Sequence, residues 1–131
     1  MKSLKIGDLT ARLPIIQGGM GVGVSLSGLA SAVANEGGVG VISSAGLGVI
    51  YKEHSSDYNE ASIWGLKEEL RKAREATRGI IGVNVMVAMS NFADMVKTCC
   101  RYRGYQCGAD YAEGFRQCQV YLKGTTKRYL P

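Results

Sequence analysis

The first stretch of the chain whose residue types could do chemistry is rich in glycine and lies near the amino terminus. Residues 14–16 read Pro-Ile-Ile, which predicts a short buried strand, and four glycines follow within residues 18–23. Backbone without side chains lets N–H groups and carbonyls approach a flat or charged ligand closely. Because an apolar helix is predicted at residues 26–36, the ligand position would lie between a strand and a helix, where α/β proteins bind cofactors.

Two common glycine motifs fit this stretch poorly or not at all. A Walker phosphate-binding loop ends in Gly-Lys-Ser or Gly-Lys-Thr, but no lysine occurs between Lys5 and Lys52. A dinucleotide fingerprint has the spacing Gly-x-Gly-x-x-Gly and an acidic residue after the second strand. Here the glycines at 19, 21 and 23 alternate, and residues 43–44 are serines. Neither motif therefore accounts well for this stretch.

Three segments carry a resemblance to a known family. They are PIIQGGMG at residues 14–21, LASAVANEGGVGVIS at 29–43 and GVNVMV at 82–87. Together they resemble the amino-terminal part of the nitronate monooxygenase (2-nitropropane dioxygenase) family, from about Leu4 to Lys97. Close relatives of that family include FMN-dependent enoyl-carrier-protein reductases, and the residues present do not separate the two.

The resemblance implies a fold, a cofactor and a reaction. The fold would be the first β-α units of an FMN-binding TIM (β/α)8 barrel, and such a barrel takes about 250 residues, so this chain would hold roughly half of one. Gly19, Met20 and Gly21 would lie under the isoalloxazine ring, and Asn84 would hydrogen-bond near it. In the family, FMN passes electrons between an alkyl nitronate and O2, which yields nitrite and a carbonyl compound.

Asn84 is also unusual by its position alone. It interrupts the apolar run of residues 80–87, where an unsatisfied amide would cost about 1–3 kcal/mol. Its partner could be a ligand or neighbouring backbone, and the residues leave both open. The resemblance favours FMN.

Hydrophobic periodicity predicts the elements that would position these residues. Strands are expected at residues 39–43 and 80–87. Helices are expected at 26–36 with Ser25 as cap, at 60–77 with Asn59 as cap, and from Asn91 onward. Helical crossovers between strands indicate a parallel sheet. Periodicity does not decide between a doubly wound sheet and a barrel. The loosely alternating residues 1–13 are expected to plug the barrel bottom.

The character of the sequence changes near residue 98, so we divide the chain into a partial barrel domain, 1–98, and an atypical tail, 99–131. Residues 99–119 contain no Val, Ile, Leu or Met, and we expect no fourth buried strand from them. Residues 121–127 resemble the family again. Two compensating frameshifts would explain this interruption, and translating all three frames of the coding DNA would test that hypothesis.

The tail also holds the unusual charge and all four cysteines. Six basic and two acidic residues there account for four of the five net positive charges. The cysteine spacing lacks the usual zinc knuckles, so no metal site is expected. A disulfide would conflict with the cytoplasmic location that the absence of a leader favours. Arg and Tyr interleaving there is a minor argument for nucleic acid, which we do not adopt.

The expected partners are therefore a small nitronate and O2, with a homo-oligomer as an alternative, and neither nucleic acid nor a membrane. No catalytic residue is assigned, and the only histidine, His54, lies in a polar loop where solvation is the ordinary role. The family's catalytic histidine and phosphate site lie beyond the fourth strand. We therefore expect this chain alone neither to hold FMN tightly nor to turn over nitronates.

Overall fold

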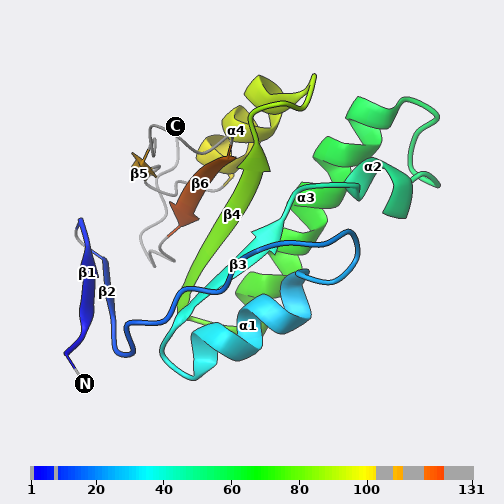
Figure 1. The fold of residues 1–131 in the computed structure, drawn as a ribbon. Helices are drawn as coiled ribbons and strands as arrows, with labels where there is room; N and C mark the ends of the chain where they lie inside the picture. Colours follow the sequence, from blue (N-terminus) through cyan, green and yellow to red (C-terminus); the bar gives the residue numbers. More distant parts are fainter. Residues whose placement is uncertain (1, 8, 103–107, 111–116, 123–131) are drawn as a thin grey trace, which may run out of the picture.

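The computed structural model describes residues 2–7, 9–102, 108–110 and 117–122 (Figure 1). An amino-terminal hairpin is formed by strands β1 (Leu4–Ile6) and β2 (Leu9–Ala11). The main sheet has the strand order β3-β4-β6-β5; in sequence, α1 precedes β3, α2 and α3 lie between β3 and β4, and α4 lies between β4 and β5. The predicted mixed α/β class is confirmed. A closed barrel is not present among the described strands.

The two parallel strands of this sheet agree with the prediction. β3 (Val39–Ser43) and β4 (Ile80–Met86) pair in parallel, in a register that runs from Val39 opposite Ile80 to Ser43 opposite Asn84. β3 is buried along its whole length, as expected for a β-branched strand covered on both faces. The parallel pairing follows from the helical crossover between the strands.

The segment expected as the first buried strand is the main departure at this end of the chain. Residues 14–17 form a single parallel bridge, between Ile16 and Val39, with backbone bonds on either side of it. The side chains of Ile15 and Ile16 are 51% and 42% exposed, so the prediction of burial is wrong. The reason is that no described strand pairs with the outer edge of this segment, which leaves its apolar side chains uncovered.

The helices follow the predicted positions with different caps. α1 spans Ser27–Asn35, α3 spans Tyr58–Ala76 and α4 spans Phe92–Arg101. α3 is capped by Asp57, whose carboxylate accepts from the Glu60 N–H at 2.8 Å, rather than by Asn59. α1 has no cap from Ser25. A short helix, α2 (Leu47–Ile50), interrupts the connection that was expected to be a loop.

One core fills the space between the sheet and the helices, which cover the same face (Figure 1). It contains side chains from β3, β4, α1, α3 and α4, including a stripe on α3 at Leu66, Leu70 and Ala73, which recur at helical spacing. A second, smaller cluster lies on the helix-free face, where the hairpin packs on Val39 and Val41. The hairpin therefore covers the amino-terminal end of this face, and its role as the plug of a barrel stays a prediction.

The expectations for the tail are partly wrong. α4 continues through Cys99, which is fully buried, past the proposed domain boundary. Strand β6 (Gln117–Leu122) pairs antiparallel with β4, and β5 (Gly108–Asp110) pairs with β6. β6 thus begins within residues 99–119, from which no strand was expected, and its last three residues include the apolar residues Val120 and Leu122. Cys100 is disulfide-bonded, against the expectation of reduced cysteines.

Candidate functional site

The candidate site lies at the carboxyl end of β4, on the face of the sheet that carries no helix. Asn84 is 3% exposed, and its Nδ2 donates to the carbonyl oxygen of Gly19 at 3.1 Å. The same nitrogen lies 3.5 Å from the sulfur of Met20. The fold therefore brings together three of the four predicted site residues, Gly19, Met20 and Asn84, although Asn84 is more than 60 positions away in the sequence. Of the two partners that the sequence analysis considered for Asn84, a ligand or neighbouring backbone, the structure contains the backbone partner.

Gly19 is a glycine for a different reason from the one expected. Its φ of +60° lies in the left-handed region, and a methyl group in place of its hydrogen would lie 2.3 Å from Val41 Cγ1. That methyl group would also lie 3.2 Å from Asn84 Cβ. The space of the missing side chain is therefore filled by the sheet itself. The expectation that this glycine leaves backbone bare for a ligand is wrong at Gly19.

Open backbone is found beside Gly19 instead. A methyl group on Gly18 would meet no atom within 4 Å, and one on Gly21 would contact only Val24 of the same loop. The Met20 side chain is 55% exposed, so it covers no core. Backbone free of side chains, a flexible thioether and a buried amide suit a flat heteroaromatic group such as a flavin ring. These residues fit FMN, with Gly18 added to the predicted set.

Buried and half-buried polar residues that the sequence analysis missed hold the loop of residues 18–26 against the sheet. Gln17 accepts from the Val41 N–H and donates to Ser25 Oγ, each at 3.2 Å. The Ser43 N–H donates to the Ser25 carbonyl at 2.7 Å, and the Ser44 hydroxyl donates to the Asn84 carbonyl at 2.9 Å. Gln17 carried the same signal as Asn84, a polar amide at the end of an apolar run.

Apolar side chains surround this turn on the outside. Val22 and Val24 in the loop, and Val49 and Ile50 in α2, are all exposed. Gly46 lies against Val22 and Gly23 lies near Ile50, which places α2 beside the loop. Clustered exposed apolar groups mark surfaces that contact a ligand or another protein segment.

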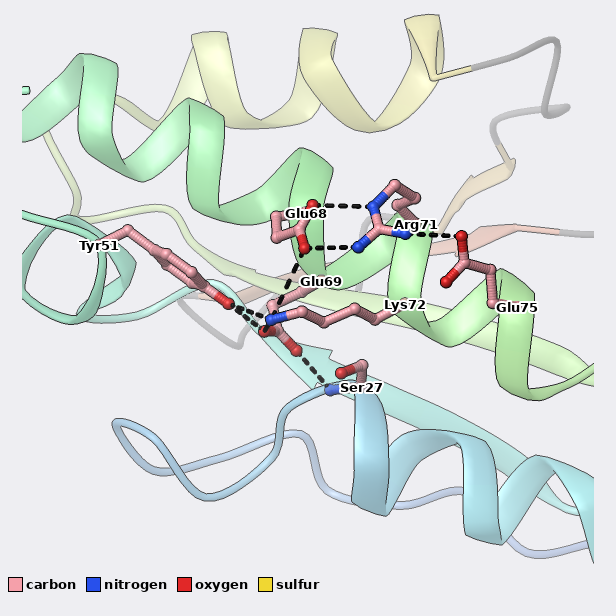
Figure 2. Close-up of polar contacts among 7 residues, drawn as sticks. All are labelled: Ser27, Tyr51, Glu68, Glu69, Arg71, Lys72 and Glu75. Atoms are coloured by element: carbon pink, nitrogen blue, oxygen red, sulfur yellow. Dashed lines mark hydrogen bonds and ion pairs between the residues drawn. The ribbon is translucent and has the colours of Figure 1, made fainter. Parts of the chain in front are cut away.

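A buried carboxylate on α3 anchors the start of α1 just after the loop (Figure 2). Glu69 is 2% exposed, and its Oε2 accepts from the Ser27 N–H at 2.7 Å, which satisfies a free donor at the first turn of α1. Its other oxygen accepts from the Tyr51 hydroxyl. Lys72 pairs with Glu69 at 3.5 Å and donates to the Tyr51 oxygen at 3.1 Å. One side chain thus joins α1, α2 and α3.

The electrostatics of this cluster keep the proton on tyrosine. Burial raises the pKa of Glu69, but the hydrogen bonds from Tyr51 and Ser27 and the charge of Lys72 outweigh it, so this pKa lies below its ordinary value. Burial and the bond to Glu69 raise the pKa of Tyr51. The sequence analysis gave Glu69 no role. Its spacing of three from Leu66 and four from Ala73 placed it on the core stripe.

His54 lies apart from the candidate site in its contacts. It is exposed, and its ring stacks on Trp64 with 3.3 Å between ring centroids. Nothing in this arrangement gives it a catalytic role. Among the residues that the structure describes, no group of three or more His, Cys, Asp or Glu could hold a metal ion, and no helix is long and apolar enough to cross a membrane.

Comparison with known proteins yields one match. The family described as nitronate monooxygenase matches residues 2–121, a span that includes the glycine turn, Glu69 and Asn84 and extends past the point where the chain changes character. Searches of curated proteins and of solved structures found no match. Because the family match covers far more than half of the chain, this protein belongs to the nitronate monooxygenase family of oxidoreductases.

Proposed function

We propose that this chain is the flavin-facing part of an FMN-dependent oxidoreductase of the nitronate monooxygenase type, acting on alkyl nitronates and O2. The observation that carries the proposal is the contact of the buried Asn84 amide with the Gly19 carbonyl. This contact holds the turn with Met20 exposed and Gly18 open at the carboxyl end of parallel strands. In α/β barrels the ligand site lies at that end.

The roles of the residues follow from their contacts. FMN would supply the electron transfer between nitronate and O2, and the protein would supply position and exclusion of water. Backbone at Gly18 and Gly21 would lie against the ring, with Met20 packed on it. Asn84 fixes the turn through Gly19, and Gln17 and Ser25 fix its two ends on β3. The parallel β3–β4 pair would belong to a TIM barrel, as the family implies.

We expect the isolated chain to hold FMN weakly. In such barrels the phosphate is bound after strands seven and eight, so ring contacts alone would have to retain the cofactor. Purified protein should be colourless after desalting and should consume no O2 with propyl nitronate. A yellow sample that consumed O2 with the nitronate would contradict this expectation about the isolated chain, while supporting the family reaction.

A titration with FMN, followed by nuclear magnetic resonance of the 15N-labelled chain, tests the site itself. Shifts should be confined to the amides of Gly18, Met20 and Gly21 and to the side-chain amide of Asn84. Asn84→Ala should abolish them, because the turn loses its anchor. Asn35→Ala is the matched control, since its amide donates at 3.2 Å to Ala76 O, at the far end of α1. Shifts elsewhere, or the same shifts in Asn84→Ala, would overturn the proposal.

A second candidate is a homo-oligomer without catalytic activity. It is favoured by one observation, the exposed Ile15 and Ile16 on an edge whose outer side pairs with no described strand. Open strand edges with apolar side chains pair readily with another chain. Light scattering should then give a discrete dimer, and the substitution Ile15→Lys should make it dissociate into monomers. A monomer at all concentrations would exclude this candidate.

A further inference from the structure

A hollow of about 490 Å³ lies between α3 and α4, on the helix side of the molecule. Ile63 and Lys67 line it from α3. Asp94, Lys97, Thr98 and Arg101 line it from α4, with Tyr102 at its end. Positions 94, 97, 98 and 101 form one ridge of α4, so the helical repeat directs all four toward α3. This hollow is separate from the candidate flavin site, which lies on the helix-free face of the sheet.

Three cations line this hollow, from α3 and from α4. Lys67, Lys97 and Arg101 make no salt bridge within the described part of the chain. The neighbouring face of α3 is different, because Arg71 bonds Glu68 at 2.7 Å and Glu75 at 2.6 Å (Figure 2). The same helix therefore neutralises its cations on one side and leaves positive charge on the other.

Two other polar residues of the hollow, Asp94 and Thr98, already make hydrogen bonds. The Thr98 hydroxyl donates to the Asp94 carbonyl at 2.7 Å, and the Asp94 carboxylate accepts from Asn59 at 3.4 Å. The three cations are thus the groups of this hollow with donors to offer. Arg offers a planar fork that matches phosphate oxygens, and each Lys adds a point charge.

From these contacts we infer that the hollow between α3 and α4 binds a small phosphorylated molecule. Its phosphate would lie among Lys67, Lys97 and Arg101, and its apolar part against Ile63 and Tyr102. A volume of this size suits a ligand of a few hundred daltons. The inference does not rest on the proposed flavin chemistry, and the two can fail separately.

Calorimetric titration of the full chain with inorganic pyrophosphate, at constant ionic strength, tests the inference. The double variant Lys97→Gln, Arg101→Gln should bind at least about tenfold more weakly, because two charge-assisted bonds are lost. The matched control is Lys5→Gln, Lys52→Gln, which removes the same charge from exposed positions outside the hollow and should bind as the unmodified chain does. Lys67→Gln repeats the test from α3, should the double variant fail to fold.

Two results would overturn the inference. One is pyrophosphate binding that is absent, or that falls equally in both double variants, since the effect would then be one of net charge. The other is binding of the single-stranded RNA poly(U) that requires Lys97 and Arg101 without any binding of pyrophosphate. That result would assign the surface to nucleic acid.

Discussion

The two ends of the sheet's helix-free face are held by different interactions, apolar packing at one end and hydrogen bonds at the other. At the amino-terminal end, the hairpin packs its apolar side chains on Val39, Val41 and Ile80. At the carboxyl end, the half-buried side chain of Gln17 and the buried side chains of Ser25 and Asn84 hold the glycine loop by hydrogen bonds. Outside that loop, Met20, Val22 and Val24 are exposed.

This difference indicates that the amino-terminal end mainly stabilises the fold, whereas the carboxyl end holds a defined local geometry. Apolar packing tolerates many arrangements of similar volume, whereas hydrogen bonds from buried amides fix one geometry because an unmade bond is costly. At the carboxyl end, hydrogen bonds from polar side chains therefore hold a backbone turn whose outer side chains are exposed. Such a precise but uncovered surface is typical of a ligand site.

The largest effect is expected from Gly19→Ala. The left-handed backbone and the clash with Val41 should together lower the free energy of unfolding by about 2–4 kcal/mol. Gly18→Ala is the control in the same loop, and it should change stability by less than about 0.5 kcal/mol, because its methyl group meets open space. Urea denaturation measures both. Equal effects would show that the two glycines do not differ as described.

Val39→Ala and Val24→Ala compare the two ends with the same substitution. Val39 is fully buried under the hairpin, so its truncation should cost about 2 kcal/mol. Val24 is 65% exposed, so its truncation should leave the denaturation midpoint nearly unchanged. The chemical-shift changes induced by FMN should show the opposite order: they should survive Val39→Ala and weaken in Val24→Ala. A stability loss at Val24 matching that at Val39 would place the loop in a core.

Glu69→Gln tests the anchor beneath the loop. It should lower stability at pH 7 by about 1–3 kcal/mol, since a charged acceptor of two hydrogen bonds is lost. Because the folded-state pKa lies below the ordinary value of 4.5, ionised Glu69 contributes stability above pH 4.5 that is lost as the pH falls through the folded pKa. The difference from the unmodified chain should therefore shrink below pH 4.5.

The control for this substitution is Glu75→Gln, which breaks an exposed ion pair with Arg71 and should cost less than about 0.5 kcal/mol. Denaturation series between pH 3 and pH 7 measure both variants. A Glu69→Gln penalty that stayed constant over that range would show that the charge of Glu69 does not contribute as proposed.

The smallest effect on stability is expected from Met20→Ala. Its side chain is 55% exposed, so the free energy of unfolding should change by less than about 0.5 kcal/mol. FMN-induced shifts at the neighbouring glycines should nevertheless weaken, because the ring loses its packing partner. Unfolding of this variant at the same denaturant concentration as Gly19→Ala would contradict the picture of an uncovered site.

Much of the fold could be predicted from periodicity, for reasons that are local. β3 and β4 are near-continuous β-branched runs, and the α3 stripe repeats at helical spacing, so each segment reports its own burial. Asn84 could be singled out because a polar amide in an apolar strand needs a partner. The cap of α1 could not be predicted, because Glu69 comes from 42 positions away. The antiparallel pairing of β6 with β4 could not be predicted either, because the sequence of one strand does not specify the direction of its partner.

The sequence by itself determined that β3 and β4 become buried strands and that α1, α3 and α4 become helices, and it singled out a glycine turn and an amide that needs a partner. Only the tertiary structure decided what those glycines are for. Gly19 makes room for Val41 and Asn84, while Gly18 opens outward, although the two residues are chemically identical neighbours. The physical reason is that a missing side chain has no direction in the sequence, and only packed neighbours define whether protein or open space takes its place.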